Sequence, residues 1–227
     1  MTTIMRIAEP SSTRGPASYE REWAMATKEP SKRTEQKEQS HQRIVAAAAR
    51  QFREAGLGGA GVQRIMEEAG LTHGGFYTHF DSKADLAAEA LALAMKTSHE
   101  GWLERAELLH GPGGMRQMLD VYLNRAHRDR PGAGCPLSST SADVARAAPV
   151  VRRAYESELR KIIESLERHL VDPEDDEAHE RAVGALALCV GGLLLARAVD
   201  DGALSDDILN ACRQFGADLA KERRDDE

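Results

Sequence analysis

The chain is predicted to be an all-α protein, and three observations lead to that prediction. Apolar residues recur three and four positions apart through much of its 227 residues, which is the period of a helix with one buried face. Breaks rich in glycine and proline, GPGG at 111–114 and RPGAGCP at 130–136, separate segments of helical length. The segment AVGALALCVGGLLLARAV is apolar nearly all round, as expected of a buried helix.

The first helix is expected from about Gln42 to Ala55. Gly56 can end it, because glycine readily adopts the positive φ of a helix C-terminus. One face of this helix is apolar and carries Ile44, Val45, Ala48, Phe52 and Ala55. Residues 1 to 38 are polar, contain proline and lack periodicity, so a flexible arm is expected before the helix.

Two short helices joined by a tight turn are expected next, between Val62 and Lys83. Gly70 can end the first of them by taking a positive φ. Thr72 is expected to cap the second, since its hydroxyl can accept a bond from a free backbone N–H. The first helix has one apolar face made of Val62, Ile65, Met66 and Ala69.

The second of these helices has one anchoring face and one bare face. Phe76 and Phe80 stand four residues apart and share a side, whereas Gly74 and Thr78 fall on the opposite side. Two successive glycines, Gly74 and Gly75, each cost roughly 1 kcal/mol of helix propensity relative to alanine. Close approach to another molecule is the better reason for them, and an α-helix fits the major groove of DNA.

The stretch LTHGGFYTHFDSKADL resembles the recognition-helix signature of TetR-type transcriptional regulators, and the similarity extends upstream through IVAAAARQFREAGLGGAGVQRIMEEAG. The resemblance implies a three-helix, helix-turn-helix DNA-binding unit at residues 39–83, after an arm at 1–38. An α-helical effector-binding and dimerisation domain would follow at 84–227. Because the segment after Met25 has the length usual before the first helix of this family, translation from Met25 rather than Met1 is a hypothesis.

The resemblance and the bare helix face together imply which residues contact DNA. Tyr77 and Lys83 are expected to bind phosphates, and His73 and Thr78 to reach base edges, since only groove contacts specify sequence. His79 is equally a candidate for phosphate contact or for a structural role, and Arg43 for phosphate contact or for ordinary exposure. The full set expected at the DNA is Arg43, Thr72, His73, Gly74, Tyr77, Thr78, His79 and Lys83.

Helices are expected through the rest of the chain. Ser82 and Asp85 form a capping box at the start of a long helix running to about Leu108. Further helices are expected at about 115–128, 138–147, 149–170, 178–199 and 205–221.

The last two helices are expected to form the dimer interface. Gly184, Gly191 and Gly192 would permit another helix to approach closely. By resemblance to the family, these helices from two subunits pack as a four-helix interface in a homodimer. Two-fold symmetry then places two recognition helices about 34–36 Å apart on a palindromic operator.

The resemblance also implies a ligand cavity among the helices between Lys83 and Val171. The protein would then be a ligand-responsive repressor that a small-molecule effector releases from its operator. A filled core would have the same periodicity, so both readings stay open. The candidate lining residues are Met95, Trp102, Met118, Tyr122, Tyr155 and Leu159.

The three cysteines, Cys135, Cys189 and Cys212, form no C-x-x-C pair and no zinc-type spacing, which fits a reducing cytoplasm. Cys135 lies in a glycine-bounded loop downstream of Arg128 and Arg130, whose charge would favour a thiolate. It is therefore a candidate redox or electrophile sensor, with a small buried residue as the alternative. No metal site, cofactor or catalytic residue is expected; a Cys135–histidine enzyme is the remote alternative.

Charge separates the chain into two parts. Residues 1–83 hold 12 Lys and Arg against 10 Asp and Glu, a net charge of +2, whereas the remainder holds 18 against 27, a net charge of −9. The acidic part need not touch DNA. It also makes a second class conceivable, a helical protein-interaction dimer that no longer binds DNA. No unbroken apolar run of about 20 residues is present and residues 1–24 lack a signal-peptide centre, so a soluble, cytoplasmic protein without membrane partners is expected.

Overall fold

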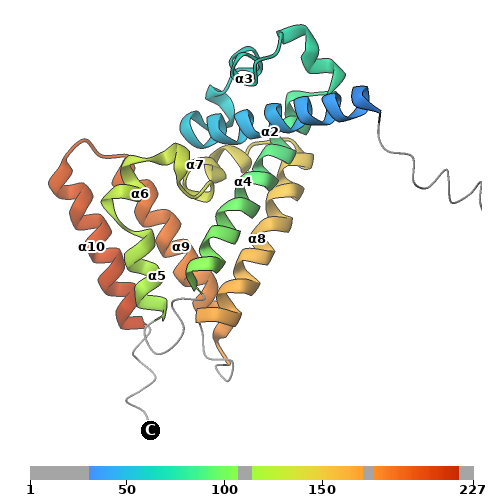
Figure 1. The fold of residues 1–227 in the computed structure, drawn as a ribbon. Helices are drawn as coiled ribbons and strands as arrows, with labels where there is room; N and C mark the ends of the chain where they lie inside the picture. Colours follow the sequence, from blue (N-terminus) through green and yellow to red (C-terminus); the bar gives the residue numbers. More distant parts are fainter. Residues whose placement is uncertain (1–30, 107–113, 171–175, 220–227) are drawn as a thin grey trace, which may run out of the picture. The chain divides into compact units, whose positions relative to one another are not determined.

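The computed structural model describes residues 31–106, 114–170 and 176–219, with the side chains of 102–106, 169–170 and 218–219 left out (Figure 1). All the regular structure in these residues is helical. Of these described residues, those from Ser40 onward form one compact unit, and those up to Gln39 belong to a separate N-terminal unit. Helix α2 (Lys32–Gly59) starts in the N-terminal unit and continues into the larger one.

Helix α2 starts ten residues earlier than expected. Ser31 caps it, because its Oγ accepts a hydrogen bond from the backbone N–H of Thr34 at 3.3 Å. The first turns are polar on every side, so hydrophobic periodicity could not reveal them. The expectation of a flexible arm to residue 38 is therefore wrong for residues 32–38, and residues 1–30, including Met25, lie outside the described residues.

Near its C-terminus, α2 breaks at Gly56, which has φ of 70° as expected of a glycine ending a helix. The backbone N–H of Leu57 then donates to Oδ2 of Asp143, at 2.8 Å. Any Cβ on residue 56 would lie 2.5 Å from that same oxygen, so glycine is needed for space as well as for its φ.

The helix-turn-helix consists of α3 (Val62–Glu68) and a six-residue 3-10 helix, η1 (His73–Thr78). Gly70 between them has the predicted positive φ, 69°. The second element was expected to be α-helical, and the two glycines that open it provide no side chains to favour the wider helix. Thr72 precedes η1 in extended conformation but makes no side-chain capping bond, so the predicted cap is wrong.

Helix α4 (Lys83–Ala106) opens with the predicted capping box. The hydroxyl of Ser82 accepts from the backbone N–H of Asp85 at 3.2 Å and donates to the carboxylate of the same residue at 2.7 Å. Its first three turns are buried with α2, α3 and η1 in one hydrophobic cluster. Farther along, Met95 belongs to a second cluster, so α4 connects the two cores.

The single helix expected at 115–128 is two helices, α5 (Gly114–Tyr122) and α6 (Arg125–Asp129). Asn124 separates them with extended φ and ψ angles of −131° and 164°. Its Oδ1 caps α6 by accepting from the backbone N–H of His127 at 2.9 Å, and its Nδ2 donates to the carbonyl of Val121.

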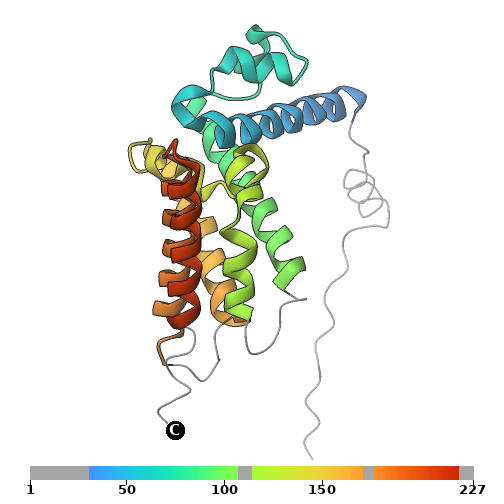
Figure 2. The same ribbon diagram turned by 90° about the vertical axis from the view of Figure 1, so that its left-hand side faces the viewer.

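The remaining elements are η2 (Pro131–Ala133), α7 (Leu137–Val144), α8 (Pro149–Leu170), α9 (Ala178–Arg197) and α10 (Gly202–Leu219). Helices α4 and α8 run side by side, as do α9 and α10 (Figures 1 and 2). Helix α5 lies beside α10 (Figures 1 and 2). The second hydrophobic cluster lies among α4, α5, α7, α8, α9 and α10.

Candidate nucleic-acid interface

The recognition segment η1 is held from one side by two aromatic rings. Phe76 and Phe80 are both buried, and their ring centroids lie 5.7 Å apart in a stacked arrangement. This confirms that the two phenylalanines share the anchoring face. The opposite side of η1 faces away from the core, because the four residues there are exposed: Thr72, His73, Gly74 and Thr78.

Tyr77 projects from the flank of this bare face and is 71% exposed. Its ring meets Phe76 edge-on at 5.2 Å, so the base of the side chain rests on the anchor while the hydroxyl end is free to reach outward. A Cβ built on Gly74 would meet nothing within 4 Å. The surface around Gly74 is therefore open, which suits close approach by a large molecule.

The other predicted DNA contacts, Lys83, Arg43 and His79, each contact another residue of the protein. Lys83 is half-buried, and its Nζ donates to the carbonyl of Leu57 at 2.8 Å, so in this structure it ties α4 to the end of α2. Arg43 is exposed on α2, and its Nη2 donates to Oγ of Ser40 at 3.2 Å. His79 is half-buried, with its ring centroid 5.8 Å from that of His41. The roles of these residues at DNA stay predictions.

Acidic residues at the end of α3 would repel phosphate if they were uncompensated. The Glu68 carboxylate accepts from Nε of Arg50 and from Nε2 of Gln51, each at 2.7 Å. Burial acts to raise its pKa, but these bonds and the charge of Arg50 outweigh burial and lower the pKa. The Glu68 carboxylate is therefore held against α2, where the positive charge of Arg50 compensates its negative charge.

His41 is a residue of this region that sequence reasoning missed. It comes from α2, stacks on Phe80 with ring centroids 4.6 Å apart, and places Nε2 2.7 Å from Oε1 of Glu89 on α4. The two partners are 48 residues apart, so no local pattern links them. The one local hint was that His41 precedes Ile44 by three residues and Val45 by four, which places it on the apolar face of α2.

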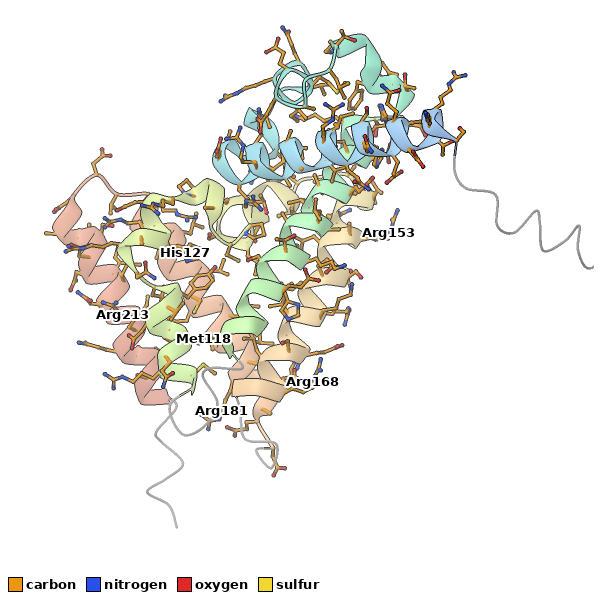
Figure 3. All side chains as sticks on the ribbon, viewed as in Figure 1. Met118, His127, Arg153, Arg168, Arg181 and Arg213 are labelled. Atoms are coloured by element: carbon orange, nitrogen blue, oxygen red, sulfur yellow. The ribbon has the colours of Figure 1, made fainter. Side chains whose placement is uncertain are left out.

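The candidate effector residues meet in the second cluster, which includes Met95, Met118, Tyr122, Tyr155 and Leu159. The side chain of Trp102 lies outside the described residues. Tyr155 also borders the first cluster, and its hydroxyl is 2.6 Å from Oγ of Ser141 on α7. The three buried members Met95, Met118 and Tyr122 come from α4 and α5, as Figure 3 shows for Met118.

Cys135 lies in this cluster as a free, buried thiol. Burial raises its pKa, which favours the alternative of a small buried residue over a thiolate, and the sensor role stays a prediction. Arg128 instead bonds to Asp129, Ser205 and Asp206. Cys189 and Cys212 are free members of the same cluster, and burial raises their pKa values as well.

The loop around Cys135 is fixed by a histidine of defined tautomer. The backbone N–H of Cys135 donates to Nε2 of His127 at 2.9 Å, so Nε2 is unprotonated. Nδ1 must then carry the proton that is donated to the carbonyl of Tyr122, at 2.8 Å. Arg197 holds the same loop from α9 by donating to the carbonyls of His127 and Arg128. Neither residue was identified from the sequence.

A second exposed face lies on α9 and α10 and is apolar. Leu195 is 58% exposed and Phe215 is 59% exposed, and the exposed large side chains of this face are Val183, Leu194, Leu195, Leu204 and Phe215. A Cβ on Gly192 would lie 2.7 Å from Sγ of Cys212, so Gly192 provides the predicted close approach between α9 and α10. Gly184 and Gly191 instead open onto space.

Among the described residues, no group of three or more His, Cys, Asp and Glu could hold a metal ion. Within the same residues, α9 alone is long and apolar enough to cross a membrane by length and composition, a test that core helices also pass. Only 22% of this apolar window is buried in the single chain; Cys189, Leu193 and Ala196 are on the buried side of α9.

Comparison with known proteins agrees with the geometry. Residues 44–90 match the model of the bacterial regulatory proteins of the tetR family. No curated protein matches the chain. A TetR transcriptional regulator from Chloroflexus aurantiacus J-10-fl is 25% identical, with a TM-score of 0.63 over 83% of this chain and 97% of that chain.

Two further solved structures share the fold. A TetR-family regulator from Cytophaga hutchinsonii is 24% identical, with a TM-score of 0.63 over 84% of this chain and 98% of that chain. The reduced form of E. coli NemR is 21% identical, with a TM-score of 0.64 over 78% of this chain and 94% of that chain. With its helix-turn-helix at the matched residues and helical domains throughout the described part, the chain belongs to the TetR family of transcriptional regulators.

Proposed function

We propose that this regulator is a repressor that binds a palindromic operator as a homodimer and is released by a small-molecule effector. The observation that carries the proposal is the exposed side of η1. Tyr77, His73 and Thr78 project from it around the open surface at Gly74, while Phe76 and Phe80 anchor the opposite side. A short helix presented in this way can enter the major groove with side chains at base edges and phosphates.

The homodimer is supported by the apolar face of α9 and α10. Large exposed apolar side chains gathered on two adjacent helices are typical of an interaction surface, since scattered single residues are the norm elsewhere. A second copy of the same face can cover it with two-fold symmetry, giving a four-helix interface. Gly184 and Gly191 on α9 leave room there for a neighbouring helix to approach.

Effector release is supported by the path of α4. Its first turns are buried with the helix-turn-helix, and Met95 is buried in the second cluster with Met118 and Tyr122. A ligand that prefers one arrangement of the second cluster would shift α4 and with it the spacing of two recognition segments. The chemistry of the effector stays open.

The test is binding of the purified full-length chain to DNA fragments from upstream of its own gene, at about 50 and 200 mM salt. One fragment should be bound best, and its affinity should fall steeply with salt, because each phosphate contact contributes a log–log slope of about −0.9. Equal, weak binding to every fragment at both salt concentrations would contradict the proposal.

A matched pair of charge deletions locates the DNA-binding face. Arg43→Ala should weaken binding and reduce the salt slope by about 1, if Arg43 contacts a phosphate. Arg153→Ala removes the same charge from an exposed site on α8, where the side chain points outward (Figure 3), and should leave both quantities unchanged. The reverse result would move the DNA-binding face away from η1.

A further inference from the structure

Beside the recognition segment, three elements meet through two rings and a carboxylate. His41 of α2 stacks on Phe80 with an interplanar angle of 24°, and Phe80 stacks in turn on Phe76. The Nε2 atom of His41 is 2.7 Å from Oε1 of Glu89 on α4. Because a carboxylate oxygen accepts, Nε2 carries the proton and the ring is oriented by this bond.

This contact bears directly on the orientation of η1. The segment is six residues long, and the 3-10 hydrogen bonds that hold it are weaker in geometry than those of an α-helix. Its position therefore depends on the Phe76 and Phe80 anchors. Phe80 stacks on both Phe76 and His41, so the His41 ring limits how far Phe80 can turn.

The pair lies near the surface, which limits what it adds to the stability of the fold. The side chains of His41 and Glu89 are 24% and 49% exposed, and ion pairs of this exposure stabilise proteins little. Functional geometry is more sensitive, because groups that read a ligand must be held within about 0.5 Å of their productive position. A contact that is minor for folding can therefore be important for recognition.

We propose that His41 is a positioning residue of the DNA-binding site, which orients the recognition segment through Phe80 and is itself held by Glu89. This rests on the proposal that η1 binds DNA. His41 touches no DNA in this role. Because Glu89 lies on α4, the helix that also carries Met95 into the second cluster, the contacts from Glu89 through His41 to Phe80 link α4 to an anchor of the recognition segment.

The test compares four variants in specific and non-specific DNA binding, salt slope and Tm. His41→Phe keeps the ring and loses the N–H donor; His41→Ala loses both. Glu89→Ala loses the acceptor; Glu89→Gln keeps an acceptor oxygen. His41→Ala should weaken operator binding by about tenfold or more, the equivalent of one well-placed base contact. His41→Phe and Glu89→Ala should have smaller, equal effects, and Glu89→Gln should restore binding.

Two readouts separate positioning from other roles. The salt slope and the non-specific affinity should stay at wild-type values, since no phosphate contact is removed. The double variant His41→Phe/Glu89→Ala should be no worse than either single variant, because both remove the same bond. The matched control is His179→Phe, which breaks a second exposed His–Glu pair, with Glu167 at 2.6 Å, far along the chain on α9. It should leave operator binding unchanged.

Several results would overturn the assignment. A salt slope reduced by about 0.9 in His41→Ala would make His41 a phosphate contact. Additive single variants would mean that the two residues act separately. Equal loss of specific and non-specific binding, together with a lower Tm, would indicate a role in folding alone. If the wild type binds its operator and all four variants match it, only the positioning role fails; if the wild type binds no fragment specifically, the proposed function fails with it.

Discussion

The exposed side of η1, here called the recognition face, differs from the apolar face of α9 and α10 in chemistry and in the packing behind it. The recognition face is polar and small, and it rests on two buried rings from one side. The α9–α10 face is broad and apolar, and it belongs to helices whose opposite sides are buried. Hydration of the polar recognition face costs little free energy, whereas exposure of the apolar α9–α10 face to water is unfavourable. The difference indicates a transient polar partner for one face and a lasting apolar partner for the other.

The largest effect is expected from charges on the apolar face. Leu195→Asp with Phe215→Asp places four carboxylates in a symmetric interface, and central apolar residues often contribute about 2 kcal/mol or more each. The dissociation constant of the dimer should rise by about a thousandfold or more. Light scattering at micromolar concentration checks this. Asn210→Asp, at an exposed position of α10 outside the apolar face, should remain dimeric. If the Leu195→Asp/Phe215→Asp variant is dimeric as well, the proposed interface is wrong.

Base and phosphate contacts at the recognition face can be told apart. His73→Ala should lose about 1–3 kcal/mol on the preferred operator and lose discrimination at one base pair. Tyr77→Phe removes one hydroxyl and should cost about 0.5–1.5 kcal/mol on every sequence alike. Binding to operators substituted at each base pair measures the loss of binding free energy in each variant and shows whether that loss depends on sequence. A uniform loss in His73→Ala would make that residue a backbone contact.

Two neighbouring glycines test whether the two sides of α9 differ as described. Gly192→Ala should destabilise the fold by roughly 1–3 kcal/mol, because its Cβ would lie 2.7 Å from Sγ of Cys212. In the monomeric background expected of Leu195→Asp/Phe215→Asp, Gly191→Ala meets open space and should be neutral or stabilising by up to about 1 kcal/mol through helix propensity. Urea unfolding measures both. Equal destabilisation by the two variants would mean that both glycines face packed neighbours.

The smallest effects concern the three thiols of the second hydrophobic cluster. A raised pKa reduces the thiolate fraction, about tenfold for each unit of increase at pH below the pKa. Cys135 and Cys189 should therefore react with iodoacetamide at pH 8 more slowly than the half-buried Cys212, and all three should react alike in urea. Mass spectrometry of labelled peptides measures the rates. A Cys135 that reacts first in the folded protein would favour the sensor hypothesis over the small buried residue.

Local signals predicted most of the elements because they depend on neighbours in the chain. Gly56 and Gly70 adopt the positive φ expected of helix-ending glycines, and the Ser82 capping box forms as its spacing indicates. Two boundaries were missed although local signals existed. Ser31 and Asn124 are both capping residues, but polar flanks hid the first and continuous periodicity on either side hid the second.

Some residues of the candidate site could be identified from the sequence, and the contacts of others could not. The spacing of Phe76 and Phe80 identified the anchoring face, and Gly74 with Tyr77 identified the open one. For Cys135 the sequence left a sensor and a small buried residue as alternatives, and its burial is decided by a cluster that draws on six helices. The bond from Lys83 to the Leu57 carbonyl was not predictable, since it depends on where α2 ends in space.

The sequence by itself determined the helical fold class, the helix-turn-helix and the residues that face outward from it, because these follow from periods and turn residues within a few positions. Tertiary structure alone decided that His41 meets Glu89 and Phe80, that Asp143 meets the end of α2, and that Gly192 faces Cys212. Each of these contacts joins residues 20 or more positions apart. Such pairs are selected by how whole helices pack, and helix packing is set by the summed shape of many side chains.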